Sequence, residues 1–185
     1  MDPVTHITAG AVAGRAIESK FARRGIMVLC IVAAIMPDID NFLALLNPGM
    51  YMAYHRSLTH SLAGGLLVAL IISFIARRFY PDISLKKTII ICYALILLHI
   101  FLDLITSYGT QILYPFSRTR YALSSVFMID PLYSAVMLIL LIFSYISRKR
   151  PAAIAAAALI FIFTYPFVNY GIRVYTEKYV NEKLT

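Results

Sequence analysis

The sequence predicts an all-α, polytopic membrane protein with about six helical segments, of which four to five are full spans. Hydrophobic residues make up 61% of the 185 positions, far more than a soluble globule of this size can bury. They fall into long apolar runs, and basic residues gather in short clusters between the runs, as in the cytoplasmic loops of membrane proteins. A bilayer accommodates such runs because lipid takes the place of a buried core.

The first two expected helices cover residues 3–22 and 26–46. The apolar part of the first is too short to cross a bilayer comfortably alone, and Arg23-Arg24-Gly25 forms the turn that follows it. The second is interrupted by Pro37-Asp38-Ile39-Asp40, because proline removes a backbone hydrogen bond from a helix interior.

The next two expected helices cover residues 59–79 and 86–107, and each has roughly the 17–25 residues that a spanning helix needs. A loop is expected before them over residues 47–56, because Pro48-Gly49 breaks helices.

The last two expected helices cover residues 129–146 and 151–170. Asp130-Pro131 is typical of a helix start, with aspartate at the N-cap and proline at the first helical position. The alanine run 155–158 favours helix in the final segment. The whole chain is interpreted as one membrane domain (1–185), with the motifs in 1–110 and C-terminal helices in 128–185.

Basic residues predict the orientation of the chain. Three turns on one side carry them and are expected to be cytoplasmic, namely Arg23-Arg24, Arg77-Arg78 with Lys86-Lys87, and Arg148-Lys149-Arg150. The opposite loops are poorer in lysine and arginine, and tyrosines gather there as in an interfacial belt: Tyr51, Tyr54, Tyr108, Tyr114 and Tyr133. Because the basic residues fit membrane loops, the net charge of +8 does not indicate nucleic-acid binding.

Histidine and aspartate side chains gather at one depth on the side opposite the basic turns. At a rise of about 1.5 Å per helical residue, they lie about 18–27 Å from the nearest basic cluster. Ionisable groups at membrane depth are expensive and usually face the protein interior with partners. The sequence therefore predicts imidazoles and carboxylates that converge on a cation. The alternative is that each is a separate interfacial residue.

His99 and Asp103 form the sharpest local signal. Positions i and i+4 share a helix face, so both side chains can reach one metal ion, and Thr106 on that face can support Asp103. The alternative is a His–Asp hydrogen bond that only satisfies two buried groups.

Asp38 and Asp40 are two residues apart and point to opposite sides of an ideal helix. Both can face one site only if the backbone is unwound after Pro37. Asp38 is the favoured ligand, with Asp40 second, and a helix-end cap is the alternative for this pair.

The segment His55-Arg56-Ser57-Leu58-Thr59-His60-Ser61 is densely polar. Thr59 or Ser57 is expected to cap the following helix, which leaves His60 in its first turn as a metal ligand. His55 is a second ligand or a proton shuttle. Arg56 is expected to hold a phosphate or carboxylate bidentately, and the alternative for it is a snorkelling interfacial charge.

Thr5 and His6 share one face of the first helix with Gly10 and Gly14. The Gly-xxx-Gly spacing lets that helix pack closely on a neighbour. His6 is the weakest histidine candidate for the metal, because a single N-terminal histidine carries little information.

Taken in order, Thr-His-xxx-Gly, Pro-Asp-x-Asp, His-Arg-xx-Thr-His-Ser and His-xxx-Asp-xx-Thr resemble the YdjM-like family of prokaryotic inner-membrane proteins, which are described as metal-dependent hydrolases. The motifs cover a little over half of the chain, from Thr5 to Gly109.

The resemblance implies a distant relation to zinc-dependent phospholipase C and the single-strand-specific P1 nuclease. By that analogy the metal ligands are His6, Asp38, His60, His99 and Asp103. The chain has no equivalent of the further His-xxx-Glu pair of those enzymes, because no histidine follows His99, so one or two metals are expected.

These observations together predict an integral membrane, metal-dependent hydrolase with its site toward the non-cytoplasmic face of the inner membrane. Zinc suits the ligand set best, followed by manganese or iron. Asp40 or His55 is expected to act as general base or acid, and Arg56 to hold the substrate. The expected substrate is a phosphoester or ester of a membrane lipid or another amphiphile.

Two other functions fit parts of the pattern. A metal-ion or solute transporter needs polar residues along a path that usually includes the midplane, and Asp38 and His99 are its best support. A haem protein would use two of the histidines as axial ligands.

Overall fold

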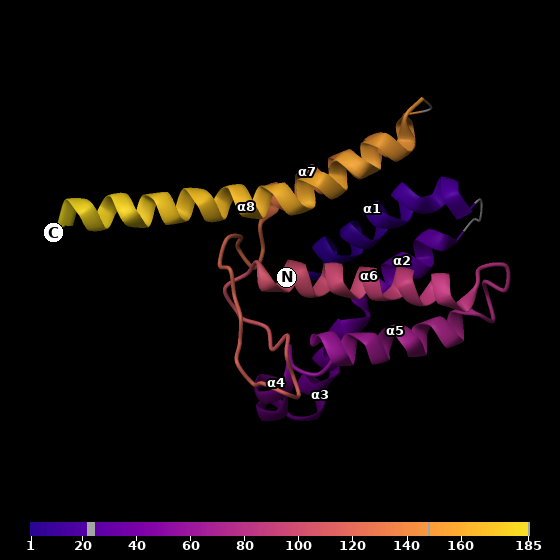
Figure 1. Cartoon of the computed structure of the whole chain (residues 1–185), viewed down its shortest axis with the longest axis horizontal. Helices are drawn as coiled ribbons and strands as arrows, with labels where there is room; N and C mark the ends of the chain where they lie inside the picture. Colours follow the sequence, from indigo (N-terminus) through magenta and orange to yellow (C-terminus); the bar gives the residue numbers. More distant parts are fainter. Residues whose placement is uncertain (22–24, 148, 185) are drawn as a thin grey trace.

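The computed structural model describes residues 1–21, 25–147 and 149–184 of the chain, which form the helical bundle shown in Figure 1. The helical elements are α1 (Pro3–Phe21), α2 (Ile26–Ile35), the 3-10 helix η1 (Met36–Phe42), α3 (Leu43–Leu46), α4 (Pro48–Tyr54), α5 (Leu62–Ala76), α6 (Leu85–Leu104), α7 (Pro131–Ile146) and α8 (Pro151–Leu184). Within the described residues there is no strand, only an isolated bridge between Thr110 and Tyr121. The all-helical prediction is confirmed.

Helices α1 and α2 pack closely through the glycines on α1. A Cβ atom on Gly10 would lie 2.8 Å from Cβ of Ala34, and one on Gly14 would lie 2.8 Å from Cα of Met27. Both distances are far below van der Waals contact, so only glycine permits this approach. The prediction of close packing from the Gly-xxx-Gly spacing is confirmed, and the contact holds α2 beside the start of α1.

The other helices complete the bundle as antiparallel neighbours, with α5 against α6 and α7 against α8, while α2 packs on α6 and α1 on α8. Tyr133 joins α7 to α8, because its buried hydroxyl donates a hydrogen bond to the carbonyl of Ile162 at 2.7 Å. The assignment of Tyr133 to an interfacial belt is therefore wrong. Its ring is fully buried between two helices, and the hydrogen bond satisfies its polar end.

Figure 1 shows that α1, α5 and α7 end, and α2, α6 and α8 begin, at the same end of the bundle. We call this the basic end, because Arg77, Arg78, Lys86 and Lys87 belong to it. Ala22, Arg23, Arg24 and Arg148, which were assigned to the helix end and turns there, lie outside the described residues.

Several helix boundaries differ from the predicted ones. The second segment is helical only to Ile35 and then narrows to the 3-10 helix η1, which agrees with the interruption expected at Pro37. The expected loop over 47–56 is wrong, because α4 fills most of it. The Asn47 side chain caps α4 by accepting hydrogen bonds from the N–H groups of Gly49 and Met50, and Pro48 occupies the first helical position.

Three described helical stretches are long and apolar enough to cross a membrane: Ile26–Leu46, Leu85–Leu104 and Pro151–Lys183. Helices α5 and α7 are shorter apolar helices. Asp130 caps α7 as predicted, since its carboxylate accepts the N–H of Tyr133 at 3.0 Å.

Helix α8 continues to Leu184, well past the expected end at residue 170, and its second half projects beyond the rest of the bundle in Figure 1. Ion pairs between Arg173 and Glu177 and between Lys178 and Glu182, both at i,i+4 spacing, support this extension. The prediction stopped at the end of the apolar run and missed this solvated continuation.

Candidate metal centre

Helix α6 supplies two of the site residues from its last turns. His99 and Asp103 are one helical turn apart and are both fully buried. The Nδ1 atom of His99 donates a hydrogen bond to the carbonyl oxygen of Ala34 on α2 at 2.7 Å. A carbonyl only accepts, so Nδ1 carries the proton and the lone pair of Nε2 points into the site. No sequence signal indicates the Ala34 contact, because a backbone atom makes it.

His60 lies in the turn before α5 rather than in the first turn of that helix. Ser61 is the N-cap, and its hydroxyl accepts the N–H of Gly64 at 3.0 Å, so the expected cap at Thr59 or Ser57 is wrong. Thr59 instead lies 3.0 Å from Nδ1 of His60 through its hydroxyl, which also donates to Oδ2 of Asp40 at 3.2 Å. This chain of contacts fixes the proton of His60 on Nδ1 and leaves Nε2 free to coordinate.

The 3-10 helix η1 places its two aspartates at the two ring nitrogens of His60. Asp38 Oδ1 lies 3.5 Å from Nε2 of His60, and Asp40 Oδ2 lies 3.3 Å from Nδ1. The residues therefore face one histidine from opposite sides, which the tighter winding of η1 allows. Asp38 belongs to the inner group, and Asp40 supports it from outside.

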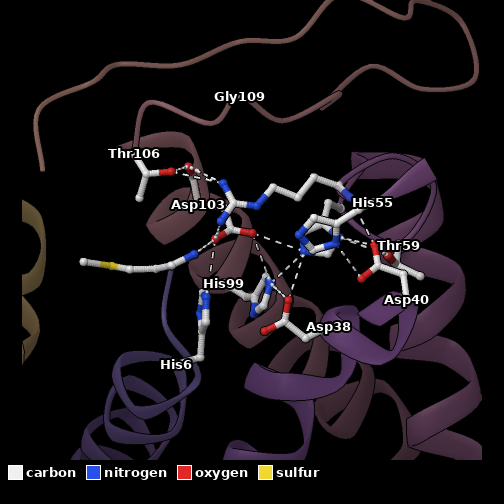
Figure 2. A network of polar contacts seen from close by, with 12 residues as sticks. His6, Asp38, Asp40, His55, Thr59, His99, Asp103, Thr106 and Gly109 are labelled. Carbon is white, nitrogen blue, oxygen red and sulfur yellow. Dashed lines mark hydrogen bonds and ion pairs between the residues drawn. The ribbon is translucent and has the colours of Figure 1, made fainter. Parts of the chain in front are cut away.

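Four ligand atoms converge, from Asp38, His60, His99 and Asp103, and all lie within 4.8 Å of one another. Figure 2 shows the side chains of Asp38, His99 and Asp103 pointing toward one another. The two Nε2 atoms are 3.0 Å apart. Asp103 Oδ2 lies 3.2 Å from Nε2 of His60 and 3.5 Å from Nε2 of His99. The Asp38 oxygen lies 3.5 and 3.7 Å from the same two nitrogens.

These separations fit a small divalent cation. Zinc binds histidine nitrogen and carboxylate oxygen at about 2.0–2.1 Å, and a tetrahedron of that size has edges of about 3.3–3.4 Å. Five of the six edges run from 3.0 to 3.7 Å around that value, and the sixth, between the Asp38 and Asp103 oxygens, is at most 4.8 Å. Two imidazole lone pairs that face each other at 3.0 Å repel unless a cation or proton lies between them.

Buried atoms without partners also test whether the residues fit a cation. Among the side chains that the structure describes, Oδ2 of Asp103 and both ring nitrogens of His6 are buried without a hydrogen-bond partner. A buried polar atom without a partner requires an explanation, and a bound ion is one. The Asp103 oxygen is the atom that faces His60 and His99, so the residues present fit a metal.

The sequence also matches a known family. The family of YdjM inner membrane proteins matches residues 1–179 of the chain. The chain belongs to the YdjM family. The uncharacterized protein YfhP of Bacillus subtilis (strain 168) is 32% identical over 138 residues, which is 71% of this chain and 42% of that protein. The chain thus spans less than half of the length of YfhP, and no solved structure matches it.

In this YdjM-family chain, His6 lies beside the four converging residues and outside their group. Its ring stacks on His99 with centroids 3.8 Å apart, and its Nε2 lies 3.4 Å from Oδ1 of Asp103, the oxygen that faces away from His60. The structure thus brings four of the five expected metal ligands to one point and places His6 against the other side of Asp103.

The other carboxylate oxygen of Asp103, Oδ1, contacts two positively charged groups of the protein. Arg56 Nη2 lies 2.8 Å from Oδ1, and the amino group of Met1 contacts the same oxygen. Arg56 Nη1 donates to the Thr106 hydroxyl at 3.0 Å, which in turn donates to the carbonyl of Asp103 at 2.7 Å. The predicted support of Asp103 by Thr106 thus takes the form of a contact with its backbone.

Arg56 is almost fully buried and has a positive φ of 57°, an uncommon conformation for a residue with a side chain. Its guanidinium lies over the ring of Tyr108 at 4.9 Å from the centroid. This cation–π contact was not predicted, because Tyr108 was assigned to an interfacial belt. The two Nη atoms of the guanidinium contact Asp103 and Thr106, while Nε has no hydrogen-bond partner, so the structure gives Arg56 a positioning contact with Asp103.

His55 and Asp40 form a dyad outside the four ligands. Nδ1 of His55 lies 3.0 Å from Oδ1 of Asp40, whose other oxygen accepts the N–H of Arg56 at 3.1 Å. The ring of Tyr51 stacks on His55 with centroids 4.6 Å apart. Asp40 therefore connects His55 directly to His60, a metal-ligand candidate.

The charged environment changes the acidity of His60, which lies outside the spanning helices. Burial alone would lower the pKa of its imidazole, but hydrogen bonds with three carboxylates, that of Asp103 first, raise the pKa to about 10. The pocket thus strongly favours a positive charge at this point, which a proton or a metal ion can supply.

Proposed function

We propose that this YdjM-family chain is a multi-pass inner-membrane hydrolase that depends on a divalent metal and cleaves a phosphoester or ester of a lipid or another amphiphile. The observation that carries the proposal is the convergence of Asp38, His60, His99 and Asp103 at separations that suit a tetrahedral ion. The site faces the non-cytoplasmic side in this proposal, because it lies at the end of the bundle opposite the basic end (Figure 1).

The donor set of two imidazoles and two carboxylates favours zinc, followed by manganese or iron. When bound, such an ion supplies Lewis acidity, which polarises the scissile group and lowers the pKa of water toward ~7. Within the chain, Ala34 and Asp40 orient the two imidazoles so that each presents Nε2.

The open side of the site lies next to Asp38. Its side chain is 17% exposed, whereas those of His60, His99 and Asp103 are fully buried. A hydrolytic centre needs a position for water or substrate, and with four protein ligands present that position would be a fifth one beside them. Access beside Asp38 is therefore what distinguishes a hydrolytic use of this cluster from a structural one.

The His55–Asp40 dyad is the proposed proton carrier. Asp40 accepts the Nδ1 proton of His55, so Nε2 of His55 is the atom that takes up or releases a proton during hydrolysis. The ring lies edge-on to His60 with centroids 5.7 Å apart, which keeps it close to the ligand cluster. Arg56 acts through Asp103, since it fixes Oδ1 and thereby aims Oδ2 at the two imidazoles.

A cleft beside Asp40 supports an amphiphilic substrate. It has a volume of about 310 Å³, with Asp40, Ser57 and Thr59 among its polar lining and Leu43, Leu58 and Tyr114 among its apolar lining. A molecule with a polar head and an apolar chain matches this combination, because each part meets groups of its own kind.

The transporter and haem alternatives find less support. The groove between α2 and α5 on the path toward the basic end is lined mainly by apolar side chains, Val28, Val32, Ile72 and Phe79 among them, whereas a transport path needs polar groups. The Nε2 atoms of His60 and His99, 3.0 Å apart, are too close to bind iron from opposite faces of a haem.

Metal analysis of the detergent-purified protein tests the proposal. We expect a bound divalent metal in the wild type and its loss in His99→Ala and in Asp103→Ala, with Asp82→Ala in the turn between α5 and α6 as control. Hydrolysis of bis-p-nitrophenyl phosphate and p-nitrophenyl butyrate in mixed micelles is expected to disappear in the same two variants. Unchanged metal content in both would refute the metal site, and a metal-loaded wild type that hydrolyses neither probe nor phospholipid would refute the enzymatic function.

A further inference from the structure

The last residue of η1 and the segment between η1 and α5 expose an unusual amount of apolar surface. The large side chains Phe42, Leu45, Leu46 and Met52 are 65%, 81%, 79% and 66% exposed. Neither α3 nor α4 has a buried residue, so this pair of short helices, which we call the α3–α4 hairpin (residues 43–54), covers no core of its own. Soluble surfaces rarely present so many adjacent large apolar groups.

The hairpin carries no charge. Between Asp40 and His55 the sequence has no aspartate, glutamate, lysine, arginine or histidine, and the polar residues are Asn41, Asn47 and two tyrosines. The other long connection at the same end, 105–130, is different, since it includes Arg118, Thr119 and Arg120. Two segments at one end of the bundle thus have opposite polarity.

Contacts with the site residues hold both ends of the hairpin at the level of the last turn of α6. Asp40 and His55, which flank it, are 3.0 Å apart, and the next residue, Arg56, contacts Asp103 in the last turn of α6. Helix α6 has 20 residues and is therefore about 30 Å long, the thickness of a bilayer's hydrocarbon layer. The chain enters and leaves the hairpin at the level of Asp103, so the hairpin starts inside or at the edge of that layer.

Figure 1 shows α3 and α4 beside the start of α5, to the side of the bundle rather than beyond the end of α6. The backbone of the hairpin is also suited to lipid, where each N–H group needs a partner. At the turn, Asn47 Oδ1 accepts the N–H groups of Gly49 and Met50 at 2.8 and 3.2 Å, and the N–H of Asn47 donates to Leu43 at 2.9 Å.

We infer that the α3–α4 hairpin is immersed in the lipid leaflet at the site end of the protein, with Leu45, Leu46 and Met52 in contact with acyl chains. The partner of this surface is the bilayer itself, because the hairpin is uncharged, internally hydrogen-bonded and continuous with the lipid-facing side of α5, where Ile71 is 60% exposed. The metal centre then opens at the level of lipid headgroups and not into bulk water.

Site-directed fluorescence measures this immersion. Leu45→Cys and Met52→Cys are labelled with the environment-sensitive dye NBD and reconstituted in phosphatidylcholine vesicles. Ile71→Cys on α5 is the lipid-facing control, and Thr119→Cys is the water-facing control. The native Cys30 and Cys92 are fully buried, so the protein without an added cysteine gives the background labelling.

At Leu45→Cys and Met52→Cys we expect blue-shifted emission, as at Ile71→Cys. Spin-labelled phosphatidylcholine is expected to quench this emission, and the quenching is expected to be stronger with a nitroxide near the headgroup than with one at the end of the acyl chain. Thr119→Cys is expected to lose emission only with aqueous iodide. Iodide quenching at Leu45→Cys and Met52→Cys without lipid quenching would overturn the inference. Blue-shifted emission that neither quencher reduces would also overturn it, because protein, such as a second copy of the chain, would then cover the hairpin.

Discussion

Asp40→Asn tests whether the cluster is a metal centre without removing a predicted ligand. The Asp40 carboxylate has contacts to four groups: Nδ1 of His55, the N–H of Arg56, the hydroxyl of Thr59 and Nδ1 of His60, at 3.0 to 3.3 Å. Asparagine has nearly the same shape but no charge, and its amide NH₂ must face one of the donors. Loss of an outer partner of a ligating histidine typically weakens metal binding about 10–100-fold, which corresponds to about 1.4–2.7 kcal/mol.

The assay is a competition titration of the detergent-purified protein against a chromophoric chelator for zinc. Asp82→Asn makes the same chemical change near the basic end and is expected to bind zinc as the wild type does. Circular dichroism of both variants reports whether the helices are intact. If Asp40→Asn is helical and binds zinc with unchanged affinity, Asp40 does not orient a ligand and the reasoning fails.

Three further predictions concern packing, pH and metal removal. Gly10→Ala is expected to destabilise the protein by about 1–3 kcal/mol, because the new methyl group would lie 2.8 Å from Cβ of Ala34. Gly171→Ala, which has open space around it, is expected to be neutral or stabilising by up to about 1 kcal/mol. A thermal melt of both variants in detergent checks this, and equal melting temperatures would contradict it. Zinc affinity is expected to rise as the pH rises from 6 to 9, because the pKa of His60 is about 10 and zinc binding must displace its proton. The rise is up to about tenfold per pH unit for each proton released, and a titration at several pH values that gives one constant affinity would contradict this. Removal of the metal with a chelator is expected to lower the thermal stability of the wild type, by about 2.7 kcal/mol relative to protein in metal at 100 times its dissociation constant, and to leave that of Asp103→Ala unchanged.

Much of the fold could be predicted from local sequence. Apolar runs and basic clusters gave the helices and the turns between them, and Asp130-Pro131 gave the start of α7, because caps and hydrophobic length act within a few residues. The predicted helix boundaries were wrong where a helix is not apolar or where its start contains residues that usually break helices. Helix α4 has a proline and a glycine at its start, and the second half of α8 is polar, so composition alone did not identify either as helix.

The site could be predicted in part for a related reason. His99 and Asp103 share a face through helix geometry alone, so their spacing already placed them together. The position of His60 was harder to predict, because whether it lies in α5 or in the turn before α5 depends on which hydroxyl group caps that helix. The predicted cap was wrong, yet the side chain still reaches His99, since the turn is held by Asp40 and Arg56.

By itself, the sequence determined that the protein is a helical membrane protein of the YdjM type, and that its four histidines and most of its aspartates lie at one end of the helices. Both follow from hydrophobic length and from the rise per residue along a helix, which are local properties. Only the tertiary structure decided that His6 faces Oδ1 of Asp103 while His60 and His99 face Oδ2, and that Arg56 turns inward to the same carboxylate. These side-chain directions depend on how separate helices are rotated and how closely they approach each other, and the contact of α1 with α2 at Gly10 is the main example. Such contacts join residues that are too distant in the chain for sequence spacing to predict.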